Sequence, residues 1–115
     1  MAETTTHQSS AQDVATRREQ AAPGIHEAWE NFSRQVFADG ALPEKTKQLI
    51  AVAVAHTTQC PYCIDGHTKL ARNKGASESE VMEAIWVAAE MRAGGAYAHS
   101  TRAFHVMSTT PNGSS

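Results

Sequence analysis

Large apolar side chains in this chain recur at the spacing of an α-helix, and this spacing limits the possible folds more than any other feature. Intervals of four, three and four residues place one such set on a single helix face: Ile25, Trp29, Phe32 and Val36. In residues 44–58 a good helix start, EKTKQ, precedes the sequence IAVAVA, half of which is alanine, a poor strand former. We therefore expect an all-α fold.

Proline and glycine divide the helical pattern into segments. We expect four helices over residues 11–22, 25–38, 44–58 and 60–74. A fifth helix should begin at a capping box formed by Ser77 and Glu80. A last helix should carry Tyr97, Thr101 and Phe104 on one side. The pair Gly94 and Gly95 is expected to separate the last two helices. The polar residues 1–10 are expected to form a flexible arm, residues 11–107 the helical domain and residues 108–115 a flexible tail.

The composition favours a chain that buries its apolar surface against further copies of itself. Alanine occurs 20 times, whereas Leu, Ile, Val and Phe together occur 17 times in 115 residues. A small domain with so few large side chains buries too little area alone, so we expect an oligomer. Residues 49–55 are apolar all round, which predicts burial on every side of that helix.

Charge and hydropathy exclude several classes of partner. The formal net charge is -2, which gives no basic footprint for nucleic acid. No run of 18 apolar residues occurs, so we expect neither a membrane-spanning helix nor a membrane partner. The first ten residues lack the basic start and apolar core of a signal peptide, and we therefore expect a cytoplasmic protein.

The two cysteines, Cys60 and Cys63, form a C-x-x-C pair in which Pro61 follows the first cysteine. A residue before proline avoids the helical region and proline favours the first helical position, so Cys60 is expected near the N-cap. The positive end of the helix dipole favours thiolates there. Helical residues three apart have Cα atoms about 5 to 6 Å apart, which allows a disulfide. His67 lies one turn after Cys63, where an imidazole can take the thiol proton.

Other interpretations of these residues are open. The cysteines could pack as small hydrophobes, and a zinc site could use four side chains: His56, Cys60, Cys63 and His67. On one continuous helix those four would span about 16 Å, too far for one ion, although a break at Pro61 would allow it. No second pair of ligands at zinc-finger spacing is present, and we expect no metal. Ile64 stands where haem attachment needs histidine, and a thioredoxin-like fold needs strands that this sequence lacks.

The span from about Gly24 to Phe104 resembles the AhpD-like alkylhydroperoxidase and carboxymuconolactone decarboxylase superfamily. The stretch that carries the resemblance is LPEKTKQLIAVAVAHTTQCPYCIDGHTKLARNKGASESEVMEAI. It joins a helix to a C-x-x-C-x-x-x-H helix start, a KGAS turn and an acidic-apolar helix. The resemblance implies an AhpD-like all-α fold around a central helical hairpin, assembled as a homo-oligomer, either a trimer or a hexamer.

Within the peroxidase branch, the resemblance implies that Cys63 attacks the peroxide, that Cys60 resolves it as a disulfide and that His67 relays the proton. The family also places a glutamate twelve residues before the first cysteine, where this sequence has Gln48. An amide can orient His67 but cannot take a proton, which implies a weaker or differently driven peroxidase. Glu44, one turn earlier, is a candidate substitute for the missing carboxylate.

We therefore expect a thiol peroxidase that uses a peroxide substrate and an external dithiol reductant, with no bound metal or organic cofactor. One alternative is a decarboxylase acting on a small carboxylated lactone, for which Arg92, Arg102 and His99 are candidate pocket residues. Another alternative is a non-enzymatic redox-sensing oligomer, which Gln48 favours.

Overall fold

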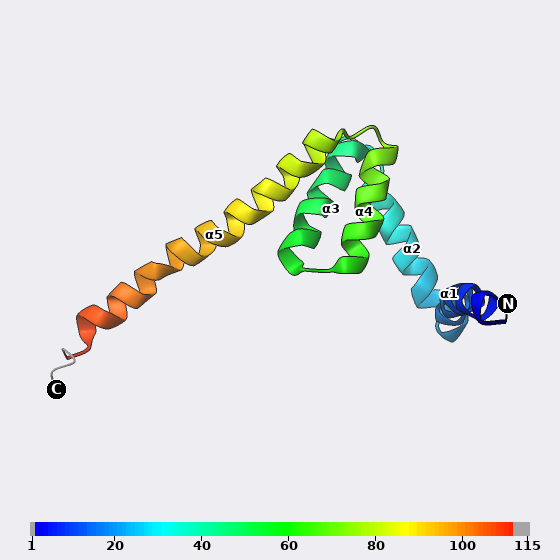
Figure 1. Ribbon diagram of the computed structural model, residues 1–115, viewed down its shortest axis with the longest axis horizontal. Helices are drawn as coiled ribbons and strands as arrows, with labels where there is room; N and C mark the ends of the chain where they lie inside the picture. The colour runs from blue at the N-terminus through cyan, green and yellow to red at the C-terminus, as the bar shows by residue number, and fades with distance from the viewer. Residues whose placement is uncertain (1, 112–115) are drawn as a thin grey trace. The chain divides into compact units, whose positions relative to one another are not determined.

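The computed structural model describes the backbone of residues 2–111 and the side chains of residues 11–111, and this part of the chain consists of helices without strands (Figure 1). The helices are α1 (Ala2–Ala21), α2 (Pro23–Phe37), α3 (Glu44–Thr58), α4 (Pro61–Asn73) and α5 (Glu78–Thr109). The all-α prediction is confirmed. Internal contacts divide the chain into two units, Met1–Ala38 and Asp39–Ser115.

Two helices differ from the expected boundaries. α1 begins at Ala2 rather than near residue 11, and residues 2–10 contain no proline or glycine that would stop a helix there. α5 runs without a break from Glu78 to Thr109, so the prediction of a separate last helix is wrong. Each glycine costs a helix only about 1 kcal/mol relative to alanine and keeps its N–H donor, so Gly94 and Gly95 do not end it. The expected tail at 108–115 is wrong at its start, since residues 108 and 109 belong to α5, and residues 112–115 lie outside the described residues.

In the first unit, α1 contacts α2, and α2 begins with Pro23 at its first helical position. The predicted apolar face of α2 forms, and the rings of Trp29 and Phe32 lie 5.9 Å apart. Its large side chains are exposed in the single chain: Ile25, Trp29, Phe32 and Val36. The helix is therefore amphipathic as predicted, with an apolar face that solvent reaches.

In the second unit, α3 and α4 form a helical hairpin and the first half of α5 packs against it (Figure 1). Val52, Ala71 and Ala76 are buried at the centre, and three further apolar residues pack around them: Leu49, Val81 and Ile85. Gln59 closes the hairpin in a left-handed conformation with φ of 58°, which directs the chain back along α3.

The turn between α4 and α5 has the geometry that its sequence predicts. Gly75 has φ of 92°, and the N–H groups of Gly75 and Ala76 donate to the carbonyls of Arg72 and Ala71, as in a Schellman motif. The capping box of Ser77 and Glu80 is confirmed, with both of its hydrogen bonds present. These caps set where α5 begins and hold its first turns against the hairpin.

An ion pair between Glu80 and Lys45, with 2.8 Å between Oε2 and Nζ, ties the start of α5 to α3. The Lys45 ammonium, and then the backbone N–H of Ser77, hold the pKa of Glu80 below its ordinary value. The carboxylate is therefore favoured in the folded state.

The prediction that residues 49–55 are buried on every side is wrong for the single chain. Val52 and Ala55 are buried, but Ile50 and Val54 are 48% and 53% exposed. The reason is that α4 and α5 cover only part of the circumference of α3. Within the described residues, none of the helices combines the length and apolar character that crossing a bilayer requires.

Candidate redox site

The two cysteines lie at the N-terminus of α4 as the sequence predicts. Cys60 is the N-cap residue, with extended backbone, and Pro61 takes the first helical position. The Sγ atom of Cys60 accepts the backbone N–H of Cys63 at 3.3 Å. The Cα atoms of the two cysteines lie 5.3 Å apart, and their sulfur atoms are paired as a disulfide. The backbone therefore already has the geometry of the oxidised pair.

Gln48 of α3 reaches across the hairpin to His67 of α4. The distance between Oε1 of Gln48 and Nδ1 of His67 is 2.7 Å, and Gln48 is only 2% exposed. An amide oxygen accepts hydrogen bonds and cannot donate them, so Nδ1 of His67 is the donor. In the neutral ring the lone pair then resides on Nε2. The contact fixes both the orientation and the tautomer of the imidazole.

Accessibility at this site is intermediate. Cys60, Cys63 and His67 are each half-buried, whereas Gln48 is buried behind them. His67 lies one helical turn after Cys63, a spacing that places both side chains on the same side of α4. A small molecule can therefore reach the cysteines while the imidazole is held from within the hairpin.

Glu44 does not take the place of the missing carboxylate. Its Oε1 atom lies 3.3 Å from Nζ of Lys74, and its backbone N–H donates to Asp39 at 2.7 Å. Lys74 caps the C-terminus of α4, about 20 Å along the helix from the cysteines at its N-terminus. The carboxylate thus belongs to an ion pair at the far end of the hairpin.

The residues considered for zinc do not form a ligand set. Nδ1 of His56 donates to the backbone carbonyl of Val52 at 2.8 Å, and the cysteines are bonded to each other. Among the described residues, no three histidine, cysteine or acidic side chains are grouped so that they could hold a metal ion.

The candidate pocket residues of a decarboxylase are dispersed along α5. Arg92 donates to the backbone carbonyl of Thr57 at 3.2 Å, and Nδ1 of His99 donates to the carbonyl of Gly95 in its own helix. Arg102 lines a pocket of about 330 Å³ near the end of α5. The structure therefore brings Arg92 to the cysteine end of α3, a contact across 35 residues that no local sequence pattern could indicate.

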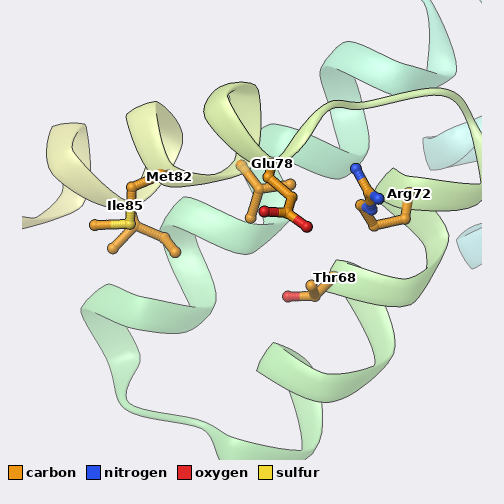
Figure 2. Close-up of a pocket in the computed structure, with 6 residues that line it drawn as sticks. Thr68, Arg72, Glu78, Met82 and Ile85 are labelled. Atoms are coloured by element: carbon orange, nitrogen blue, oxygen red, sulfur yellow. The ribbon is translucent and has the colours of Figure 1, made fainter.

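A separate pocket of about 310 Å³ lies between α4 and α5. Figure 2 shows Thr68 and Arg72 on α4 facing Glu78, Met82 and Ile85 on α5. Arg72 donates to the backbone carbonyl of Ala76 at 2.9 Å, so its guanidinium supports the turn before α5. Neither the two cysteines nor His67 lines this pocket, so it is separate from the candidate redox site.

Comparisons with known proteins place this helical arrangement in a family. The carboxymuconolactone decarboxylase family matches residues 23–105. A Paracoccus denitrificans protein called uncharacterized protein 4 in cox locus is 62% identical over 87 residues, which cover 76% of this chain and 78% of that protein.

Two solved structures are similar to this one. A protein from Methanobacterium thermoautotrophicum has a TM-score of 0.72 and 36% identity, covering 78% of this chain and 98% of that chain. The apo form of a carboxymuconolactone decarboxylase family protein from Legionella pneumophila has a TM-score of 0.63 and 32% identity, covering 75% of each chain. The resemblance drawn from the C-x-x-C-x-x-x-H stretch is confirmed, and the chain belongs to the carboxymuconolactone decarboxylase family.

Proposed function

We propose that this protein is a thiol-dependent peroxidase of the alkylhydroperoxidase type, with Cys63 as the attacking thiol and Cys60 as the resolving thiol. The observation that carries the proposal is the disulfide-competent pair at the start of α4, beside a histidine whose tautomer Gln48 fixes. No metal or organic cofactor takes part in this cycle.

The cycle begins when Nε2 of His67 accepts the thiol proton of Cys63, one turn away on α4. The thiolate attacks one peroxide oxygen, the O–O bond breaks, and the leaving alkoxide takes a proton to become an alcohol. Cys63 is now a sulfenic acid. The thiol of Cys60 attacks that sulfur, the S–S bond forms and water leaves.

Regeneration needs an external dithiol, which reduces the disulfide and becomes oxidised to its own disulfide. Attack on the sulfur of Cys63 expels Cys60 as the leaving thiolate. The N–H of Cys63 points at Sγ of Cys60, and the N-terminal end of α4 adds a positive partial charge there. This N-cap interaction favours the thiolate of Cys60, which suits a group that both resolves the sulfenic acid and leaves during reduction.

We also propose a cytoplasmic homo-oligomer, a trimer or a hexamer of this chain. Exposed apolar side chains support assembly, since they form a face on α2 and part of the outer side of α3. The second half of α5 supports it further: its sequence is rich in glycine, serine, threonine and histidine, which have poor helix propensity, yet it is helical and exposes Tyr97 and Phe104. A second copy of the chain would cover these residues.

A redox sensor without turnover is the second candidate, and Gln48 is the observation that favours it. Its amide orients His67 but cannot carry a proton away from the ring. Such a protein would oxidise its thiols once per peroxide and would not sustain consumption in the presence of a dithiol.

The experiment that tests the proposal compares Cys60→Ser with Cys63→Ser in the reduced protein. After one equivalent of an organic hydroperoxide, dimedone should label Cys63 in the Cys60→Ser protein and nothing in the Cys63→Ser protein. Peroxide consumption with excess dithiothreitol should be lost in Cys63→Ser. Unchanged consumption in that variant would refute the proposal, and activity on a carboxylated lactone that survives loss of both cysteines would favour a decarboxylase.

A further inference from the structure

A cationic side chain from α5 lies at the cysteine end of the hairpin. Nη1 of Arg92 donates to the carbonyl oxygen of Thr57, in the last turn of α3, at 3.2 Å. Arg92 is exposed, and its guanidinium has five N–H donors. Among the described residues, Thr57 accepts a hydrogen bond from one of them. The remaining donors form a planar, permanently charged group with capacity for an anion.

The position of Thr57 puts that charge close to the redox pair. Thr57 precedes Cys60 by three residues, and the backbone N–H of Cys60 is still bonded to the carbonyl of Ala55 in the same turn. The guanidinium therefore lies at the same end of the hairpin as the cysteines, and three residues of chain span at most about 11 Å. At distances of this order an exposed unit charge still attracts an approaching anion.

The α4 helix contributes one carboxylate and one positive helix end near the cysteines. Asp65 is the carboxylate within the first two turns of α4, and it lies about 200° around the helix from Cys63. The N-terminus of α4 adds positive partial charge on the side where the cysteines lie. An anion that approaches the cysteines thus meets two positive features.

We propose that Arg92 is a specificity-determining residue that makes the redox site prefer substrates carrying a carboxylate. Resting on the proposed function, this assigns the substrate class: organic hydroperoxides with a negatively charged group near the peroxide, in preference to neutral alkyl hydroperoxides. Arg92 acts by binding the carboxylate and takes no part in the breaking of the O–O bond.

The test measures thiol reactivity toward charged and neutral reagents and does not depend on peroxide turnover. The reduced full-length protein is alkylated with iodoacetate, an anion, and with iodoacetamide, its neutral analogue, and the ratio of the two rates is taken. Arg92→Met should lower this ratio about two- to fivefold, the effect of one unit charge at such a range. Arg92→Lys should keep most of it. Arg102→Met, the same change ten residues further along α5, should leave it unchanged.

An unchanged ratio in Arg92→Met would overturn the proposal, as would an equal fall in Arg102→Met. Thiols that react with neither reagent would also overturn it, because no anion could then reach them. Circular dichroism checks that each variant is folded. The same variants are then assayed with a carboxylate-bearing and a neutral hydroperoxide. If neither peroxide oxidises the thiols while the alkylation ratio still depends on Arg92, the peroxidase proposal fails and the anion site stands.

Discussion

Replacing Gln48 with glutamate tests how the buried residue behind the histidine controls the cysteines. The substitution keeps the length of the side chain and places a carboxylate oxygen where the amide oxygen now lies, 2.7 Å from Nδ1 of His67. The imidazole then gains a negatively charged partner on the side away from Nε2. We expect Nε2 to become a stronger base and to remove the thiol proton of Cys63 more readily.

The size of the effect follows from the geometry. Two unit charges about 4 Å apart interact by about 4 kcal/mol at an effective dielectric constant of 20. Position 48 is 2% exposed, so burying a carboxylate there costs several kcal/mol and offsets much of that attraction. Part of the attraction remains, so the ring of the variant should hold its second proton to a higher pH than the ring of the parent protein.

Two assays measure the outcome. The assigned Cε1–H resonance of His67 is followed by NMR as a function of pH, and the rate of thiol loss is followed at pH 7 after addition of an organic hydroperoxide. We expect the titration to move upward and the rate to rise on the order of tenfold. Gln48→Leu is the matched control, since it fills a similar volume without an acceptor, and it should slow the reaction.

A titration of His67 that is the same in Gln48→Glu and in the parent protein would refute this reasoning. So would a slower reaction in Gln48→Glu than in Gln48→Leu, provided thermal unfolding shows that both variants are folded. Either result would mean that the contact between Gln48 and His67 serves packing alone.

Four further substitutions test the scaffold. Val52→Ala removes two buried carbons from the centre of the hairpin and should lower the free energy of unfolding by about 2 kcal/mol in urea denaturation; a change below 0.5 kcal/mol would contradict the packing. Folding lowers the pKa of Glu80, chiefly through Lys45, so Glu80 stabilises the fold above its ordinary pKa. This stability is lost as pH falls through the lower folded pKa. In urea titrations from pH 6 to pH 3, the free energy of unfolding should therefore fall less in Glu80→Gln than in the parent protein. Gly95→Ala meets open space in a helix and should stabilise by about 0.5 to 1 kcal/mol. Gly75→Ala should instead destabilise the protein, since Gly75 has φ of +92°. Thermal unfolding measures the change in both glycine variants.

Local signals account for the parts of the fold that the sequence predicted well. Three helix starts are set by signals that act within one helical turn: Pro43 before α3, Pro61 after Cys60, and the Ser77 capping box. Such signals can be recognised in the sequence without knowledge of tertiary contacts. The place of Cys60 and Cys63 at the start of α4 was predicted for the same reason. Their spacing and their place at the start of a helix are properties of four consecutive residues.

Other features depend on contacts that no local pattern encodes. Gly94 and Gly95 suggested a break, yet each costs a helix only about 1 kcal/mol relative to alanine, and α5 continues through them. The exposure of Ile50 depends on how much of α3 the other helices cover, which apolar character alone does not reveal. The contact of Arg92 with Thr57 joins residues 35 apart, and only the packing of α5 across α3 brings them together.

A count of free thiols tests whether Cys60 and Cys63 form a catalytic redox pair. The reduced protein is treated with one equivalent of an organic hydroperoxide and its thiols are counted before treatment, after it, and after addition of a dithiol. We expect a fall from two thiols to none after peroxide, the return of both after the dithiol, and repeated cycles with fresh peroxide. Two thiols that stay unreacted would contradict this expectation.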